Sequence, residues 1–540
     1  MSLENSVVSL ASLNSNKNNW IVQKFGGTSV GKFAQDIAVK IVKEYSNNNR
    51  VAVVCSARST QTKSEGTTTR LLLASELAQD DKHSEFKNIL KLILDDHISN
   101  ANSLISNEKI KLDLIENTKK EVNDIERLLD ACCIIGEIST KSQDAIMACG
   151  EKLSCLFMSA LLNDNQVKSS YINLSNIVLN INKIYPNWNF GSDDNAALDP
   201  IFYKYLSQAI KLEIDLLDED TVPVLTGFFG SVPGGLLKSV GRGYTDLCAA
   251  ICAVGLEAEE LQIWKEVDGI FTADPRKVKN ARLLSSVTPD EAAELTYYGS
   301  EVIHPFTMEQ VINARIPIRI KNVMNPNGDG TIIYPDNIGR KGVETPPHPP
   351  LAPNKLPSSV YIKNQFSGKL PTAVTAKSDI SVVNIHSNKK TLSHGFLASV
   401  FGILDKHKTV VDLISTSEVH VSMAVHYSKD NRKQFLLVLQ DLKKWGEVDV
   451  THDLSIVSLV GIHMKQLIGI AGAMFKILAD EKINIEMISQ GANEINISCV
   501  IDKNEVIRAL NALHDGLLIK PFKVESEANL IAKLKLQAST

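Results

Sequence analysis

The 540-residue sequence lacks the features that mark several classes of protein. No apolar run approaches the roughly 18 residues that a membrane-spanning helix needs, so we expect no membrane anchor. The eight cysteines show no paired C-x-x-C spacing typical of a zinc site, which favours buried free thiols in a reducing compartment. The net charge of −5 is small for this length, so we expect no dominant nucleic-acid-binding surface. These absences favour a protein that acts on small molecules.

The stretch from Met1 to about Asn19 is rich in serine and asparagine, and the first arginine of the chain is Arg50. This stretch has no apolar signal core, so we expect a flexible tail over residues 1–18 and a cytoplasmic protein. Apolar residues make up 44% of the sequence and charged residues 22%, an ordinary globular composition. The length exceeds what one hydrophobic core usually serves, so two to four domains are expected.

Short apolar runs alternate with helix-forming segments through the first half of the chain. A helix is predicted from Val30 to Tyr45, and the charged stretch Ser75 to Ile135 is interpreted as a helical cover or insertion. Strands are predicted at Trp20–Phe25, Val51–Cys55, Tyr171–Leu174, Thr221–Leu225 and Leu261–Trp264. This alternation predicts an α/β layer with a mostly parallel sheet and helices on both faces.

The second half of the chain contains an internal repeat with a constant offset, since 475 − 401 = 489 − 415 = 74. Each copy predicts the order strand, helix, strand, strand, helix, strand of a ferredoxin-like module. Proline-rich sequence between Asn337 and Lys377 predicts a domain boundary before the repeat. Two such modules favour a regulatory role, and the alternative is that they only add core or oligomer contacts. The repeated residues Phe401, Ile403, Leu404, Lys408, Ile414 and Ser415 match Phe475, Ile477, Leu478, Lys482, Ile488 and Ser489.

The strongest local signal is the segment Lys24-Phe25-Gly26-Gly27-Thr28-Ser29, between a predicted strand and a predicted helix. Glycines let backbone N–H groups approach a phosphate, the helix N-terminus favours its negative charge, and Lys24 supplies a cation. A tight turn is the alternative for two adjacent glycines. A P-loop is rejected, because Phe33 stands where that motif needs Ser or Thr.

Three further segments carry candidate binding groups. The loop Gly241 to Asp246 offers a guanidinium and a carboxylate that could clamp a carboxylate substrate, or that could only cap a helix. The double turn in Trp264 to Lys277 suits nucleotide phosphates, although a surface hairpin has a similar pattern. Glu151 opens an apolar helix and could receive an ammonium group, and Gly227 to Gly230 offers an aromatic wall.

In this order the segments resemble the aspartate kinases of the amino acid kinase superfamily, whose hallmarks are KFGGTS, GE-[RK]-LS, GRG-x-[ST]-D and VDG-[IV]-[YF]-TADPR. The matches extend from about Gln23 to Pro335. The repeat resembles the tandem ACT domains that follow in that family, through HGFLASVFGIL, VVDLISTSEV and ISQGANEINIS. The whole set is most similar to fungal monofunctional members. Departures from many members are Lys265-Glu266, Tyr244-Thr245 and Glu301.

The resemblance implies a domain order and a set of site residues. The implied domains are an amino acid kinase domain at 19–338, a proline-rich linker at 339–378, and ACT domains at 379–453 and 454–523, with 524–540 as a candidate completion of the first. The implied catalytic residues are Lys24, Asp246 and Arg242, and His304 is expected nearby in a supporting role. The implied aspartate contacts are Ser56, Thr69, Glu151, Phe228 and Arg242. The implied ATP contacts are Lys24, Gly26, Gly27, Thr28, Ser29, Lys265, Glu266, Phe271 and Arg276. The implied allosteric residues are Ser393, Gly395, Phe396, Leu397, Val411, Asp412 and Ser417.

The resemblance also implies an activity and its partners. The expected reaction moves the ATP γ-phosphoryl group to the β-carboxylate of L-aspartate, giving 4-phospho-L-aspartate on the route to threonine, methionine and isoleucine. L-Threonine is the expected inhibitor, Mg²⁺ is expected to arrive with ATP rather than at a separate metal site, and the ACT domains are expected to build a homo-oligomer without nucleic-acid or membrane partners. The alternatives are a glutamate or acetylglutamate kinase and a non-catalytic amino-acid sensor. A fused homoserine dehydrogenase is disfavoured, because no G-x-G-x-x-G follows a predicted strand.

Overall fold

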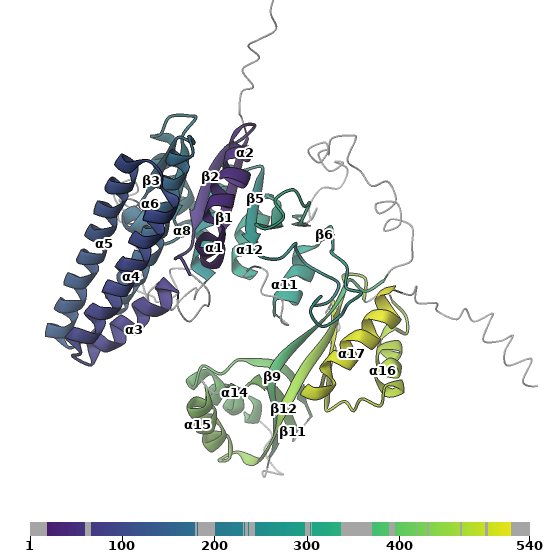
Figure 1. The fold of residues 1–540 in the computed structure, drawn as a ribbon. Coiled ribbons are helices and arrows are strands. Elements are labelled where there is room, and N and C mark those ends of the chain that lie inside the picture. Colours follow the sequence, from purple (N-terminus) through teal and green to yellow (C-terminus); the bar gives the residue numbers. More distant parts are fainter. Residues whose placement is uncertain are drawn as a thin grey trace, which may run out of the picture. The chain divides into compact units, whose positions relative to one another are not determined.

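The computed structural model describes residues 19–59, 66–178, 181, 200–230, 232, 236, 243–297, 303, 305–335, 370–387, 395–417, 420–428, 431–464, 467–491 and 495–519. The chain divides into two compact units, which are drawn in Figure 1. The first unit comprises Met1–Gly269 and Ile303–Pro335, and the second comprises Ile270–Val302 and Asp336–Thr540.

The first unit is built on a mostly parallel sheet, as the sequence predicts. Its strands follow the spatial order β3-β4-β2-β1-β5-β7-β8. All neighbours pair in parallel except β7 and β8, which are antiparallel. The strands are β1 (Trp20–Phe25), β2 (Arg50–Cys55), β3 (Ser169–Ile172), β4 (Val222–Thr226), β5 (Glu260–Lys265), β7 (Ile318–Asn322) and β8 (Thr331–Ile333).

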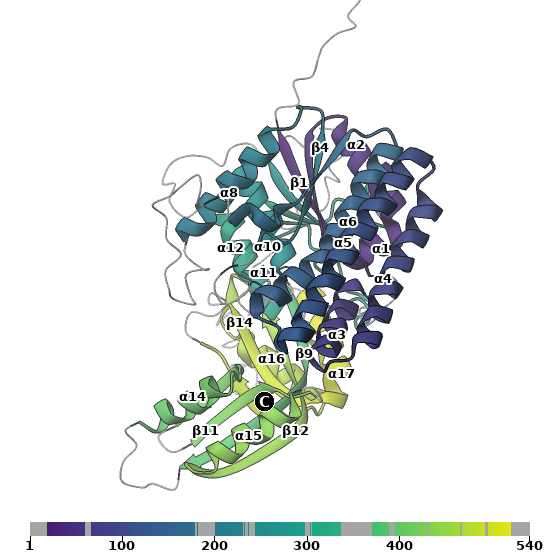
Figure 2. The same cartoon turned by 90° about the vertical axis from the view of Figure 1, so that its left-hand side faces the viewer.

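Helices cover both faces of this sheet. Helices α1 and α6 share one apolar cluster with β1, β2 and β4, while α10 packs on β1 together with α8 and α12. Figure 2 shows α6 and α8 on opposite sides of β1 and β4. The helices are α1 (Gly27–Asp36), the π-helical turn Ile37–Val42, α2 (Lys43–Ser46), α3 (Thr67–Gln79), α4 (His83–Leu104), α5 (Glu108–Ile135), α6 (Thr140–Asp164), α8 (Pro200–Asp215), α10 (Tyr244–Gly255) and α12 (Pro305–Asn313).

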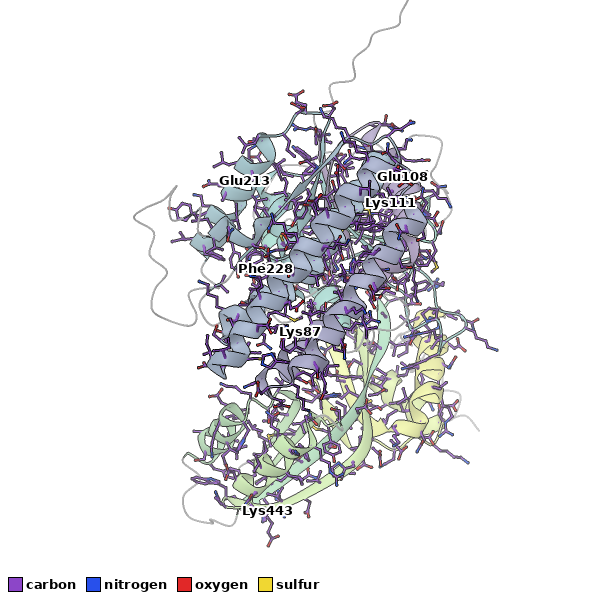
Figure 3. All side chains as sticks on the ribbon, turned by 60° about the vertical axis from the view of Figure 1, so that its left-hand side comes forward. Lys87, Glu108, Lys111, Glu213, Phe228 and Lys443 are labelled. Carbon is purple, nitrogen blue, oxygen red and sulfur yellow. The ribbon has the colours of Figure 1, made fainter. Side chains whose placement is uncertain are left out.

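The predicted helical cover is a layer of long helices outside α6. Helices α4 and α5 lie side by side (Figure 1), and with α3 they bury an apolar cluster against α6 that includes Phe86 and Leu129. Helix α5 begins at an Asn107 cap, whose side chain accepts from the backbone N–H groups of Lys109 and Ile110. An ion pair of 2.7 Å between Lys111 and Glu108, both labelled in Figure 3, adds to this first turn.

Among the described residues, α6 is the helix whose length and composition could suit a membrane span. It is long and apolar enough to cross a membrane by length and composition, with a mean hydropathy of 1.5 over its best window. However, 78% of that window is buried inside the protein. A helix placed between a sheet and an outer helical layer is apolar all round because both sides face the core, so its composition reflects packing.

The second unit contains a six-stranded antiparallel sheet in the order β10-β11-β9-β12-β14-β13. The long strands β9 and β12 pair along both halves, and each contributes to both modules. The elements are β6 (Ser286–Val287), α11 (Pro289–Tyr297), β9 (Ala373–Ser387), α14 (Phe396–Lys406), β10 (Val411–Thr416), β11 (His420–His426), α15 (Arg432–Leu442), β12 (Gly446–Val460), α16 (Ile470–Asp480), β13 (Met487–Ser489), β14 (Asn496–Asp502), α17 (Val506–Leu513) and the π-helical turn His514–Ile519.

The predicted 74-residue repeat is confirmed by the backbone itself. Helices α14 and α16 begin 74 residues apart, after Gly395 and Gly469, whose φ angles are 83° and 82°. A positive φ favours glycine, which explains why this residue type recurs there. The first module ends on the first half of β12. The second module uses the first half of β9, about residues 373–377, as its fourth strand.

The stretch Ile270–Val302 lies in the second unit, although the sequence assigns it to the catalytic domain. Its Ala273 and Val278 are buried in the apolar cluster of the second module. The backbone N–H of Val374 donates to the Thr272 carbonyl at 2.9 Å. Apolar burial and backbone pairing therefore fix this stretch to the regulatory sheet.

Candidate active site

The centre of the site is an ion pair at the C-terminal end of β1. Lys24 Nζ lies 2.7 Å from Asp246 Oδ1, and the two side chains are 11% and 16% exposed. Strand β1 is the middle of the sheet, and Asp246 lies in the first turn of α10. Because ligands of open parallel sheets bind beyond the carboxyl ends of the strands, this pair stands where a substrate is expected.

The predicted phosphate segment forms the turn from β1 into α1. Gly26 is the N-cap residue, and no side chain among the described residues caps this helix, so its first N–H groups can donate to an anion. A Cβ on Gly27 would lie 2.0 Å from the Ala57 carbonyl oxygen, and the Gly27 carbonyl accepts from the Ser59 N–H. Glycine is therefore required at position 27, because the turn from β1 into α1 packs its backbone directly against the loop after β2.

Glu151 is the most perturbed carboxyl group of the site. It lies on α6 with 1% exposure, and burial raises its pKa from 4.5 to about 8, against hydrogen bonds and the charge of Lys24, which lower the pKa. Thr245 Oγ1 donates to Glu151 Oε1 at 2.5 Å, while Glu151 Oε2 has no hydrogen-bond partner among the described residues. A buried carboxylate oxygen without a partner is costly, so a cationic group beside Glu151 Oε2 would be stabilised.

An aromatic pair lies beside this carboxyl group. Phe228, labelled in Figure 3, follows β4 and makes an edge-to-face contact of 6.3 Å with Tyr244. Both rings are buried, and Tyr244 also hydrogen-bonds Glu151. A Cβ on Gly227 would lie 2.9 Å from Glu151 Oε2, so this glycine keeps space free in front of the carboxylate.

The end of β5 contacts the phosphate segment. Ser29 Oγ donates to Glu266 Oε1 at 2.8 Å, so two of the predicted ATP contacts lie together, with Lys265 at the preceding position. Two further predicted ATP contacts, Phe271 and Arg276, belong to the second unit. There Arg276 is 87% exposed and makes a two-pronged ion pair with Asp274.

The remaining predicted residues fall into two groups. Ser56 donates its backbone N–H to the Phe25 carbonyl, next to Lys24. Thr69 lies in the first turn of α3, which begins at Thr67 beside Gly150. Gly241, Arg242, Glu301, His304 and Ser393 lie outside the described residues.

The predicted allosteric residues divide between two ends of the first module. Gly395, Phe396 and Leu397 start α14, at the end of the sheet where β10 finishes and Ser417 follows. Val411 and Asp412 start β10 at the other end, about 15 Å away at ~3.3 Å per residue. Within one chain, a single small amino acid cannot contact both groups.

Thr245 is a site residue that the sequence did not single out. It binds Glu151 through its hydroxyl group, whereas the sequence marked it only as the Thr of the GRG-x-[ST]-D motif and as part of the Tyr244-Thr245 departure, with no contact assigned. A second cluster, Asp81, His83 and Cys133, brings potential metal ligands within 4.8 Å of one another on the helical layer. The Cys133 thiol donates to the Ala78 carbonyl, and burial raises its pKa, so hydrogen bonding accounts for this cluster.

Comparisons with known proteins agree with this geometry. Residues 19–322 match the amino acid kinase family, and residues 457–517 match an ACT domain. The aspartokinase of Candida albicans is 62% identical over 505 residues, covering 92% of this chain and 90% of that protein. The aspartokinase of Saccharomyces cerevisiae is 59% identical over 513 residues, covering 93% and 94%. The structure of E. coli aspartokinase III in complex with aspartate and ADP has a TM-score of 0.65 at 26% identity, covering 92% of this chain and 99% of that chain.

The matching families, together with a parallel sheet that carries a glycine turn and Lys24 at the end of its central strand, define a kinase of the amino acid kinase family that carries ACT modules. The extent and identity of the fungal matches then settle the particular family. The chain belongs to the aspartokinases, and the enzyme is an aspartate kinase.

Proposed function

We propose that this enzyme transfers the γ-phosphoryl group of ATP to the β-carboxylate of L-aspartate, giving 4-phospho-L-aspartate. The observation that carries the proposal is the group formed by Lys24, Asp246 and Glu151, in which a cation and an unsatisfied carboxylate face one site at the end of β1. The E. coli relative was solved with aspartate and ADP, which supports the same pair of ligands here.

The chemistry requires positioning rather than a general base, because the attacking carboxylate is already a nucleophile. Two anions at about 4 Å repel by about 4 kcal/mol at an effective dielectric near 20. Lys24 and the N–H groups of the α1 N-terminus would offset this repulsion, and Asp246 would hold Lys24 in place. Mg²⁺ bound to ATP would neutralise further phosphate charge. Asp246 is already paired with Lys24, which favours a metal delivered on the nucleotide.

Glu151 would receive the aspartate ammonium group at its free Oε2. An incoming cation would supply the missing partner and shift the carboxyl group to its charged form. Arg242 would hold a substrate carboxylate, and Ser56, Thr69 and Phe228 would line the same substrate. Phe271, Arg276, Lys265 and Glu266 would line the nucleotide.

We also propose that the enzyme is cytoplasmic, forms a homo-oligomer through its ACT modules, and is inhibited by L-threonine as the end product of its pathway. An E. coli relative solved with lysine and aspartate supports amino-acid control in this family. The duplicated module and the buried Asp412 of β10 support a site on the second unit.

Substrate profiling tests the proposal. The purified chain is assayed with MgATP and aspartate, glutamate or N-acetylglutamate, with and without threonine, lysine or methionine. We expect ADP release and an acyl phosphate, trapped as a hydroxamate, only with aspartate, and inhibition only by threonine. Comparable rates with glutamate would refute the substrate assignment, and inhibition by lysine or methionine in place of threonine would refute the effector.

A further inference from the structure

A buried carboxylate in the first module is paired with a lysine from another strand. Asp412 on β10 has a side chain that is only 2% exposed, and its Oδ1 lies 2.6 Å from Lys377 Nζ on β9. Its second oxygen, Oδ2, has no hydrogen-bond partner among the described residues. The β10 pairing shifts register between Val411 and Leu413, and such bulges turn a side chain away from its regular direction. The bulge therefore gives the Asp412 side chain a direction that a regular strand would not.

Tyr297 completes this group from outside the module. Lys377 Nζ lies 4.9 Å from the centre of the Tyr297 ring, and burial together with the neighbouring Asp412 carboxylate raises the pKa of the Tyr297 hydroxyl. Tyr297 is the last residue of α11, in the stretch that joins the regulatory sheet to the catalytic unit along the chain. We call Lys377, Asp412 and Tyr297 the Lys377 cluster.

The second module lacks this arrangement. With the 74-residue offset, Lys377 corresponds to Thr451 and Asp412 corresponds to Glu486. Thr451 is exposed and carries no charge, and Glu486 is exposed and accepts from the Asn484 side chain. The duplication has therefore kept one buried carboxylate with a lysine partner, and it belongs to the first module.

The remainder of α11 is fixed to the same sheet. Glu291 Oε1 accepts from Thr372 Oγ1 at 2.5 Å and from the Ile462 N–H at 2.9 Å. Glu294 accepts from the Asn496 side chain. The start and middle of the helix are thus held by the second module, whereas Tyr297 at its end depends on the Lys377 cluster.

We propose that Lys377 occupies, in the effector-free enzyme, the place that the effector's ammonium group takes at Asp412, and that effector binding releases Tyr297. The proposal rests on the proposed amino-acid regulation and adds its mechanism. One buried carboxylate neutralises one cation, so two ammonium groups compete for Asp412. Displaced Lys377 leaves the Tyr297 ring, and the end of α11 changes its contacts. That end continues directly into the chain that returns to the catalytic unit at Ile303.

Competition predicts that removal of Lys377 tightens effector binding, whereas removal of an ordinary binding residue weakens it. The apparent dissociation constant equals the intrinsic one divided by the fraction of molecules that can bind the effector. Removal of the competing lysine raises this fraction and therefore lowers the dissociation constant. Titration calorimetry of the full chain with L-threonine should give a dissociation constant for Lys377→Met at least about threefold lower than that of the wild type. Asp412→Asn should weaken binding at least tenfold. Glu486→Gln, the matched substitution in the second module, should leave binding unchanged.

Tyr297→Phe separates binding from its transmission. It keeps the ring and removes the hydroxyl group, so threonine should still bind while maximal inhibition of the kinase rate falls by at least half. Thermal melting of each variant checks that it is folded. Weaker or unchanged binding by Lys377→Met overturns the proposal, as does full inhibition of Tyr297→Phe. If the wild type binds neither threonine, lysine nor methionine, the proposed regulation itself fails and this mechanism with it.

Discussion

The pKa of Glu151 leads to a sharp test of the substrate site. Burial raises this pKa to about 8, so the free enzyme holds the carboxyl group mainly protonated at neutral pH. Binding of an ammonium group at Glu151 Oε2 favours the charged form and must expel that proton. Glu151→Gln keeps the size and the hydrogen bond from Thr245 but carries no titratable group.

The magnitude follows from the pKa alone. With a pKa near 8, about 0.9 of the molecules carry the proton at pH 7 and about 0.25 at pH 8.5. Aspartate binding should therefore release about 0.9 protons at pH 7. The value of kcat/KM for aspartate, which reports the free enzyme, should rise about eightfold between these two pH values.

Calorimetry in buffers of different ionisation enthalpy counts the released protons, and initial rates give the pH profile. Glu151→Gln should release no proton from position 151 and should bind aspartate more weakly. Its kcat/KM for aspartate should stay nearly constant over the same pH range. A wild-type enzyme that releases no proton, or a Gln variant that releases as many, would refute the reasoning. In either case, Glu151 would not be the ammonium partner.

Four further variants test the glycine turn after β1 and the regulatory unit. Lys24→Met should reduce kcat by about 10² to 10³ in a variant that still folds but melts at a lower temperature, because it removes the cation proposed to contact the transferred group and leaves Asp246 unpaired. Gly27→Ala should destabilise the enzyme by about 1–3 kcal/mol in urea unfolding, since the new Cβ meets a backbone carbonyl at 2.0 Å. Gly402→Ala, with nothing within 4 Å, should stabilise by up to about 1 kcal/mol. Glu291→Gln should lower the stability of the regulatory unit by about 1.5–3 kcal/mol, seen as a lower melting transition.

The central strands could be predicted because buried strands consist of short apolar runs that are visible in the sequence. All six residues of β1 are buried, and the predicted and observed ranges coincide. Strand β3 begins two residues before its prediction, because Ser169 and Ser170 are polar and only partly buried. Its predicted end, Leu174, instead follows Asn173, whose side chain binds the Ser175 N–H and turns the chain. Apolar pattern alone carries no signal for such capping.

The sequence motifs of the site could be predicted, but the burial of its side chains could not. The sequence suggested that Glu151 opens an apolar helix, where a glutamate is most often solvated, but it lies in the middle of α6, is buried, and accepts a hydrogen bond from Thr245 of α10. The family resemblance identified it, whereas periodicity could not. Its contact with Thr245 was not predicted for the same reason, since it joins residues 94 positions apart.

The division of the candidate nucleotide residues between two units has a kinetic consequence. Lys24, Glu151 and Asp246 are held by the first unit, whereas Ile270–Val302 is fixed to the regulatory sheet by buried contacts, including Thr272 Oγ1 with His514 Nε2 at 2.9 Å. Because the proposed function gives Phe271 and Arg276 of that stretch a role in nucleotide binding, we expect a change in the regulatory unit to alter ATP binding more than aspartate binding. We therefore expect threonine to raise the KM for MgATP by a larger factor than the KM for aspartate, measured by varying each substrate at saturation of the other. Thr272→Val removes the hydroxyl group that contacts His514, so it should reduce the rise in the KM for MgATP that threonine causes. If threonine raises only the KM for aspartate, control does not pass through this stretch.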